Sequence, residues 1–150
     1  MDHDLIMESI FTLEVPGAPR GKGRPRFRII GKGMQQFASA YTDSDTRKYE
    51  DQLRIAAALE MGADKPFDFP LSVSVEALMP IPSSWSLKKR ASAAEGTIAP
   101  TSKPDADNIV KSLDALNKVV WRDDSLIVSL FVIKRYSLTP MLRIGVRKWF

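Results

Sequence analysis

The chain has 150 residues, of which 44% are hydrophobic and 27% are charged, with no cysteine and a single histidine. A chain of this length typically forms one domain with a self-sufficient core, so we expect a single domain over residues 1–150. Without cysteine the chain has neither a disulfide framework nor a thiolate metal site, and the lone His3 excludes a histidine-rich zinc site. Any metal must therefore be held by oxygen ligands, which suit Mg²⁺ or Mn²⁺.

The positive charge of the chain is concentrated in separate segments. The net charge is +4, and residues 16–40 hold six basic side chains and no acidic one. Such segregation favours an acidic partner. No apolar run approaches the ~20 residues needed to span a membrane, and the first residues lack the apolar stretch of a signal peptide. We expect a cytoplasmic protein, with residues 1–8 as a loose extension before an alternative start at Met7.

The first half of the chain predicts a strand, a basic segment, a helix and a second strand. Residues 9–15 alternate as a strand does, and residues 17–40 predict a mobile loop or loose β-ribbon, either a phosphate-gripping arm or a solvated charged loop. A helix capped by Asp43 or Ser44 should end at Gly62. Its apolar stripe comprises Tyr49, Leu53, Ala56 and Leu59. Residues 69–79 then alternate as a half-buried strand.

The second half predicts two helices and two strands. Ser84 could cap a short helix that carries Trp85, which we expect in the core rather than stacked on a base, and a flexible segment should follow. The main helix should run from Pro104 to about Asn117. Residues 126–136 predict an apolar core strand, and residues 141–149 pair back as a hairpin. The fold class is therefore α+β, a mixed sheet of about four strands packed by two main helices.

Five aspartates lie within residues 103–128 of this basic chain. Asp105 and Asp107 fall at the start of the main helix, where carboxylates cap and complement the helix dipole. Capping explains one of them, and it does not explain Asp123 and Asp124 beyond the far end of the helix. If the two groups meet in the fold, their mutual repulsion calls for a cation. The residues alone leave a metal site and a set of capping and surface charges equally open.

The residue pattern of this stretch resembles the RusA family of Holliday junction resolvases. The similarity rests on Lys103–Asn108, Lys111, Asp114–Asn117, Trp121 and Asp123–Ser125, and it extends to residues 19–27, 41–42 and 82–90. It implies a small α/β homodimer, bacterial or phage-encoded, that binds four-way DNA junctions and nicks two strands symmetrically with Mg²⁺ or Mn²⁺. Leu126 departs from the family, whose members often carry Gln there.

The resemblance also implies roles for individual residues. Asp105, Asp107 and Asp124 would be the metal-binding catalytic residues, Lys111 the catalytic lysine and Asp123 a further candidate ligand, whereas Asp114 fits the structural pattern of the helix. The residues expected to bind DNA are Arg20, Lys22, Arg24, Arg26, Arg28, Lys88, Lys89, Arg90 and Lys103. One alternative is a non-catalytic DNA-binding protein of recombination or repair. Another is a small-substrate phosphoryl-transfer enzyme, for which the Gly21–Gly23 loop is too arginine-rich.

Overall fold

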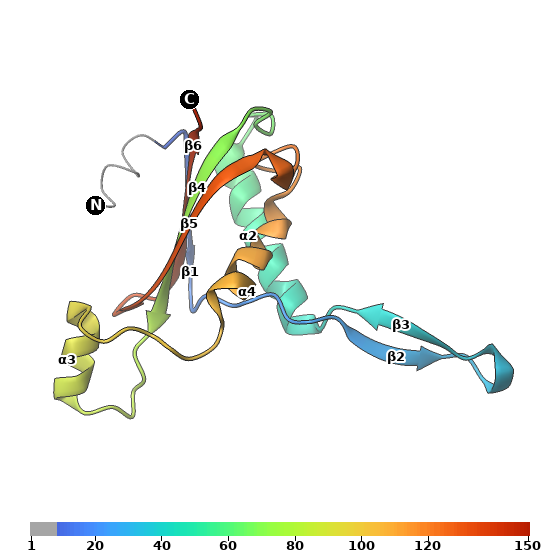
Figure 1. Ribbon diagram of the computed structural model, residues 1–150, viewed down its shortest axis with the longest axis horizontal. Helices are drawn as coiled ribbons and strands as arrows, with labels where there is room; N and C mark the ends of the chain where they lie inside the picture. Colours follow the sequence, from blue (N-terminus) through green and yellow to red (C-terminus); the bar gives the residue numbers. More distant parts are fainter. Residues whose placement is uncertain (1–8) are drawn as a thin grey trace.

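The computed structural model describes residues 9–150, and the expected N-terminal extension lies outside the described residues. Its centre is a four-stranded sheet in the order β1-β6-β4-β5 (Figure 1). β4 and β5 are parallel and the other neighbours are antiparallel, so the predicted mixed α+β sheet is confirmed. The predicted hairpin between residues 126–136 and 141–149 was wrong, because β6 pairs with β1 and β4 and not with β5. The strands are β1 (Phe11–Pro16), β4 (Leu71–Pro80), β5 (Ile127–Ser137) and β6 (Met141–Lys148).

The sheet has one apolar face and one polar face, as the alternating residue patterns predict. The alternating apolar residues of β1, β4 and β6 point to one face and form the core, with Val75 and Ile144 fully buried. The opposite face is polar because threonine, serine, glutamate and arginine side chains alternate with them: Thr12, Glu14, Ser72, Ser74, Glu76, Arg143 and Arg147. Arg143 on β6 lies between Glu14 and Glu76, with its Nε 3.3 Å from the Glu14 carboxylate and its Nη1 3.7 Å from that of Glu76.

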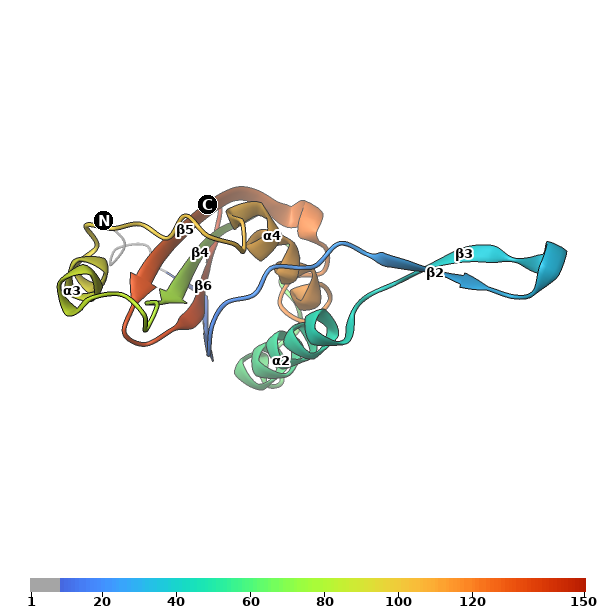
Figure 2. The same cartoon turned by 90° about the horizontal axis from the view of Figure 1, so that it is seen from below.

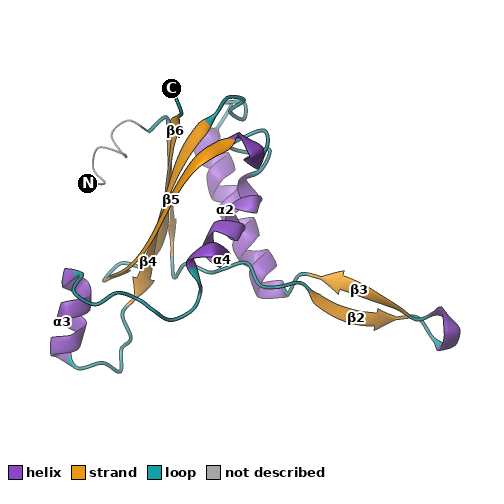
Figure 3. Ribbon diagram, in the orientation of Figure 1, coloured by secondary structure: helices purple, strands orange, loops and turns teal. Residues whose placement is uncertain are grey.

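Helix α2 (Ser44–Met61) covers the apolar face of the sheet (Figure 3). Asp43 is the N-cap and its carboxylate accepts a hydrogen bond from the Thr46 backbone N–H at 2.8 Å. The buried stripe includes Tyr49 and Leu53 as predicted, but it continues through Ala57 and Met61, and the predicted member Leu59 is exposed. Among the described residues, no helix is long and apolar enough to cross a membrane.

The predicted main helix is divided into two parts. Helix α4 (Ala106–Lys111) begins two residues after Pro104, and a 3₁₀ segment, η2 (Ser112–Leu116), continues it to the predicted end. The predicted apolar stripe is confirmed, because all of its members are at most 4% exposed: Ile109, Leu113, Leu116 and Val120. The members of the opposite stripe are exposed, as predicted: Asp107, Lys111, Asp114 and Lys118.

Helix α3 (Leu87–Glu95) stands away from α2 and α4 (Figure 1). Ser86 rather than Ser84 caps it, accepting a hydrogen bond from the Lys89 N–H. The alanine-rich residues after Arg90, expected to be flexible, complete the helix because alanine favours helix. Trp85, expected as a lid over a small core, is half-buried with its ring edge-on to Tyr136, which packs against the core.

The expectation that residues 126–133 form core is confirmed only in part. β5 is the edge strand of the sheet: Leu126, Ile127 and Val132 pack half-buried against the core, whereas three other apolar residues are exposed. The exposed fractions are 53% for Val128, 44% for Leu130 and 39% for Phe131. An apolar run without charges reads as core in the sequence, and only the strand order reveals that one side of it has no neighbouring strand.

Part of the basic segment forms a two-stranded ribbon that projects from the body (Figure 2). β2 (Arg26–Ile30) pairs antiparallel with β3 (Phe37–Tyr41), and a short 3₁₀ turn, η1 (Gly33–Gln35), joins them. Of the two predictions for this segment, the β-ribbon is the one that the structure adopts. We call residues 24–42 the arm.

Candidate active site and nucleic-acid interface

Asp105 and Asp107 lie at the exposed start of α4. Asp105 occupies the N-cap position, yet its side chain makes no capping hydrogen bond. Asp107 is one turn before Lys111, whose Nζ lies 3.8 Å from its carboxylate, and both side chains are mostly exposed. A pair of this kind contributes only about 0.3–0.5 kcal/mol. These two carboxylates therefore contribute little to the stability of the fold.

The adjacent Asp123 and Asp124 have different roles. Asp123 caps the 3₁₀ turn η3 (Asp124–Leu126), accepting a hydrogen bond from the Ser125 N–H at 3.1 Å. The hydrogen bonds from Ser125 hold the pKa of Asp123 below its usual range. The Asp124 carboxylate has no hydrogen bond or ion pair within the described part of the chain. Asp123 is thus explained by local structure, and Asp124 is not.

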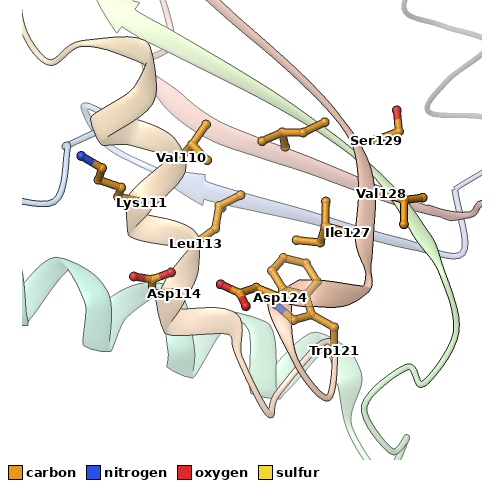
Figure 4. A pocket seen from close by; sticks show the side chains of 10 residues that line it. Val110, Lys111, Leu113, Asp114, Trp121, Asp124, Ile127, Val128 and Ser129 are labelled. Atoms are coloured by element: carbon orange, nitrogen blue, oxygen red, sulfur yellow. The ribbon is translucent and has the colours of Figure 1, made fainter.

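Asp124 returns to the side of the main helix, as the sequence requires for any shared site. It lines a pocket of about 310 Å³ together with Lys111 and Asp114 (Figure 4). The walls of the pocket are apolar and come from α4, η2 and β5. Trp121 is a buried wall residue, fixed by a 2.7 Å hydrogen bond from its Nε1–H to the Asn117 side-chain oxygen. This tether sets the path of the chain into η3 and so the position of Asp124.

The carboxylates of the described residues do not form a complete metal site. Among residues 9–150, no group of three or more His, Asp or Glu side chains is placed to hold a metal ion. The available donors are carboxylate oxygens, which suit a hard cation. The prediction that Asp105, Asp107 and Asp124 share one cation therefore stays a prediction.

Lys22 anchors the base of the arm to the body. Its ammonium lies 3.3 Å from the carboxylates of both Glu50 on α2 and Asp114 on η2, and its backbone N–H donates to the Asn108 carbonyl at 2.9 Å. Burial alone lowers the pKa of Lys22, but the hydrogen bond to Asp114 and the charge of Glu50 outweigh it and raise the pKa. The neighbouring Gly21 allows this close approach, because a Cβ there would lie 2.8 Å from the Asn108 Cβ.

The sequence placed Lys22 among the DNA-binding residues and did not single out Glu50. The helix pattern did mark Asp114 as structural, but nothing in the sequence indicates its partner, which lies 92 positions away. A partly buried lysine between two carboxylates is recognisable only after α2 and η2 are packed together.

Four of the predicted DNA-binding cations gather around one open groove. The groove has a volume of about 470 Å³ and lies between the base of the arm, the start of α2 and the start of α4. Gly21 and Gly23 line it as well, where they let the chain pack closely on Asn108 and Asp43. The basic residues that line it are Arg20, Lys22, Arg26 and Lys103. Since Lys103 and Pro104 immediately precede Asp105, the groove adjoins the carboxylates at the start of α4.

The remaining predicted DNA-binding cations fall into two groups. Arg24 and Arg28 are exposed on the arm, where the Arg28 guanidinium lies 5.4 Å from the centre of the Tyr41 ring. The other group is on α3, where the Lys89 ammonium lies 3.9 Å from the centre of the Trp85 ring. Lys88 is exposed and Arg90 half-buried on the same helix. The two groups lie at opposite ends of the molecule (Figure 2).

The fold and the site together define a class of protein: a small α+β domain in which Asp105 adjoins a groove with four basic residues and Asp124 lines a separate pocket, as expected for a protein that works on nucleic-acid phosphates. The chain belongs to the RusA endodeoxyribonuclease family, whose match covers residues 16–147. It is also 35% identical over 137 residues to the uncharacterized protein YqaN of Bacillus subtilis (strain 168), a similarity that covers 89% of this chain and 93% of that protein.

Proposed function

We propose that the protein is a Mg²⁺-dependent, structure-selective endonuclease that binds four-way DNA junctions and resolves them by paired, symmetric cuts. The observation that carries the proposal is the division among the aspartates. Asp43, Asp114 and Asp123 each have a clear structural partner, whereas Asp105 and Asp124 have none in the described chain. Exposed carboxylates left unengaged, Asp105 next to the groove and Asp124 in the neighbouring pocket, are consistent with a catalytic role.

The groove at the base of the arm would hold the DNA backbone. Arg20, Arg26 and Lys103 can neutralise phosphates along it. Family membership supports DNA as the polyanion. Binding of this kind weakens steeply as the salt concentration rises.

Mg²⁺ is the proposed cofactor, with Mn²⁺ as an alternative. Asp105, Asp107 and Asp124 would hold it, and bound DNA phosphates can supply oxygen ligands that a single chain lacks. When bound, such a cation polarises the phosphate and activates water. Lys111 lies on the rim of the same pocket as Asp124 and within 4 Å of Asp107, where its charge would stabilise negative charge that develops on the phosphate.

The proposed assembly is a homodimer. A four-way junction has two-fold symmetry, so paired cuts are achieved directly by two identical sites related by a dyad. The exposed apolar start of β5, with Val128, Leu130 and Phe131, supports association, because an unpaired apolar edge strand is a template for pairing.

The variant Asp107→Asn tests the catalytic proposal. It keeps the shape of the side chain and removes its charge, so we expect junction binding to persist while cleavage is lost. The matched control is Asp64→Asn, an equal change of charge at an exposed position after α2, which should bind and cleave like wild type. Normal cleavage by Asp107→Asn would refute the assigned role.

A non-catalytic DNA-binding protein is the second candidate, and it is favoured by the lack of a three-carboxylate group among the described residues. In that case the protein would bind junctions at every Mg²⁺ concentration and cut none of them. The Asp107→Asn variant would then be indistinguishable from wild type in all assays.

A further inference from the structure

The two faces of the arm differ in chemistry. Residues paired across an antiparallel ribbon share a face, and successive residues alternate. The pairs Phe27–Ala40 and Ile29–Ala38 therefore make one face entirely apolar. The other face carries Arg26 and Arg28 with their partners Tyr41 and Ser39, and it ends in the apolar pair Ile30–Phe37. The contact of Arg28 with Tyr41 confirms this assignment.

The apolar face of the arm has no partner within the described chain. Phe27 is 71% exposed and Ile29 is 73% exposed, while Met34 at the tip is fully exposed. A two-stranded ribbon is marginally stable alone in water, and a contiguous exposed apolar surface marks an interaction site. The apolar face of the arm is therefore a candidate surface for binding a partner.

Charge identifies the kind of partner. No acidic residue occurs between Glu14 and Asp43, whereas the arm itself carries Arg24, Arg26, Arg28 and Lys32. Such a surface repels another cationic surface and attracts a polyanion. A two-stranded ribbon also fits the ~12 Å width of the DNA major groove. Phe, Ile and Met side chains are the types that nucleic-acid-binding proteins insert between base steps.

The base of the arm fixes its direction. Lys22 and Gly21 hold the start of the arm against α2, η2 and Asn108, next to the groove proposed for the DNA backbone. A strand of five residues spans roughly 17 Å. The apolar face therefore lies beyond the groove, within reach of base pairs that flank a phosphate held beside Asp105.

We propose that the apolar face of the arm, formed by Phe27 and Ile29, inserts against unstacked bases at the branch point of a DNA junction, while Arg26 and Arg28 on the opposite face hold phosphates. This inference rests on the proposed function. It makes the arm the element that distinguishes branched DNA from continuous duplex, because bases at a branch point cost less to unstack than bases inside a duplex.

The test uses the full chain and a four-way junction that carries 2-aminopurine beside the branch point, without Mg²⁺ so that no cleavage is required. Wild type should increase the fluorescence, because unstacking relieves quenching. The double variant Phe27→Ser with Ile29→Ser should lose this increase, and its junction affinity should fall roughly tenfold or more towards its duplex affinity. Its duplex affinity should stay within about twofold, because the phosphate contacts remain.

Two further variants control for shape and position. Phe27→Leu with Ile29→Val keeps the face apolar and should retain the fluorescence increase. Phe37→Ser removes a 59% exposed aromatic from the opposite face and should leave junction selectivity unchanged.

Three outcomes would overturn the inference. The first is a double serine variant that shows the same fluorescence increase and the same junction affinity as wild type. The second is an equal loss of affinity for junction and duplex, which would mean that the arm supplies general contacts only. The third is a lower molecular mass of the double serine variant than of wild type in sedimentation, which would mean that the apolar face joins two copies of the chain. If wild type binds and cuts junctions without a fluorescence change, only this inference fails; if wild type neither binds nor cuts them, the proposed function fails.

Discussion

Replacing Lys22 with methionine should loosen the base of the arm and destabilise the fold. The ammonium is shared by Glu50, whose side chain is only 16% exposed, and by Asp114, whose side chain is 49% exposed. Exposed pairs contribute about 0.2–1 kcal/mol, and breaking a fully buried pair costs about 3–5 kcal/mol. This network lies between the two cases, so we expect a loss of about 1–2 kcal/mol in the free energy of unfolding at pH 7.

The assay is urea unfolding, compared with Arg24→Met as a control that removes the same charge from an exposed side chain of the arm. The control should lie within about 0.5 kcal/mol of wild type. Because the pKa of Lys22 is raised in the folded state, its contribution is fully present below the ordinary pKa of 10.5 and is lost as pH rises through the higher folded value. Equal stability of the two variants at pH 7 would refute the anchoring role of Lys22.

Three other changes should have separable effects. Asp43→Ala removes the N-cap of α2 and should lower the urea midpoint at pH 7. Because the hydrogen bond from Thr46 lowers the pKa of Asp43, the difference from wild type should shrink as the pH falls through the lowered folded pKa. A difference that persists in acid would contradict the capping role of Asp43. Trp121→Phe should cost about 2–3 kcal/mol in urea unfolding, because it leaves a cavity and an unpaired Asn117 oxygen; a near-neutral effect would argue against the tether. Leu130→Asp should convert the proposed dimer into a monomer in sedimentation. Leu59→Asp, the same change at an exposed position of α2, is the control and should leave the mass unchanged.

The sequence predicts the main layers because their periodicity is strong. The stripe from Ile109 to Val120 and the alternation of β1, β4 and β6 each mark the buried side directly. The failures have physical causes. Residues 126–133 are as apolar as a central strand, but strand order, which depends on long-range packing, puts β5 at the edge. Helix α3 extends further than expected because three of its last five residues are alanine, which favours helix.

The candidate site was predictable in composition and less so in geometry. The aspartate spacing indicates candidate metal ligands, but it cannot show that Asp123 accepts a hydrogen bond from Ser125 while Asp124 has no partner in the described chain. It also gives no sign that Asp114 anchors Lys22, since the two residues meet only when the base of the arm packs on η2. Local patterns specify which side chains are present, and tertiary packing decides which of them remain free for chemistry.

Cleavage of a labelled four-way junction, compared with a matched duplex and measured with and without Mg²⁺, tests the proposed activity most directly. We expect two symmetric nicks in opposing strands of the junction, only when Mg²⁺ is present, and no cutting of the duplex. Equal cutting of both substrates would indicate a general nuclease, and binding without any cleavage in Mg²⁺ or Mn²⁺ would contradict the catalytic role assigned to Asp105, Asp107 and Asp124.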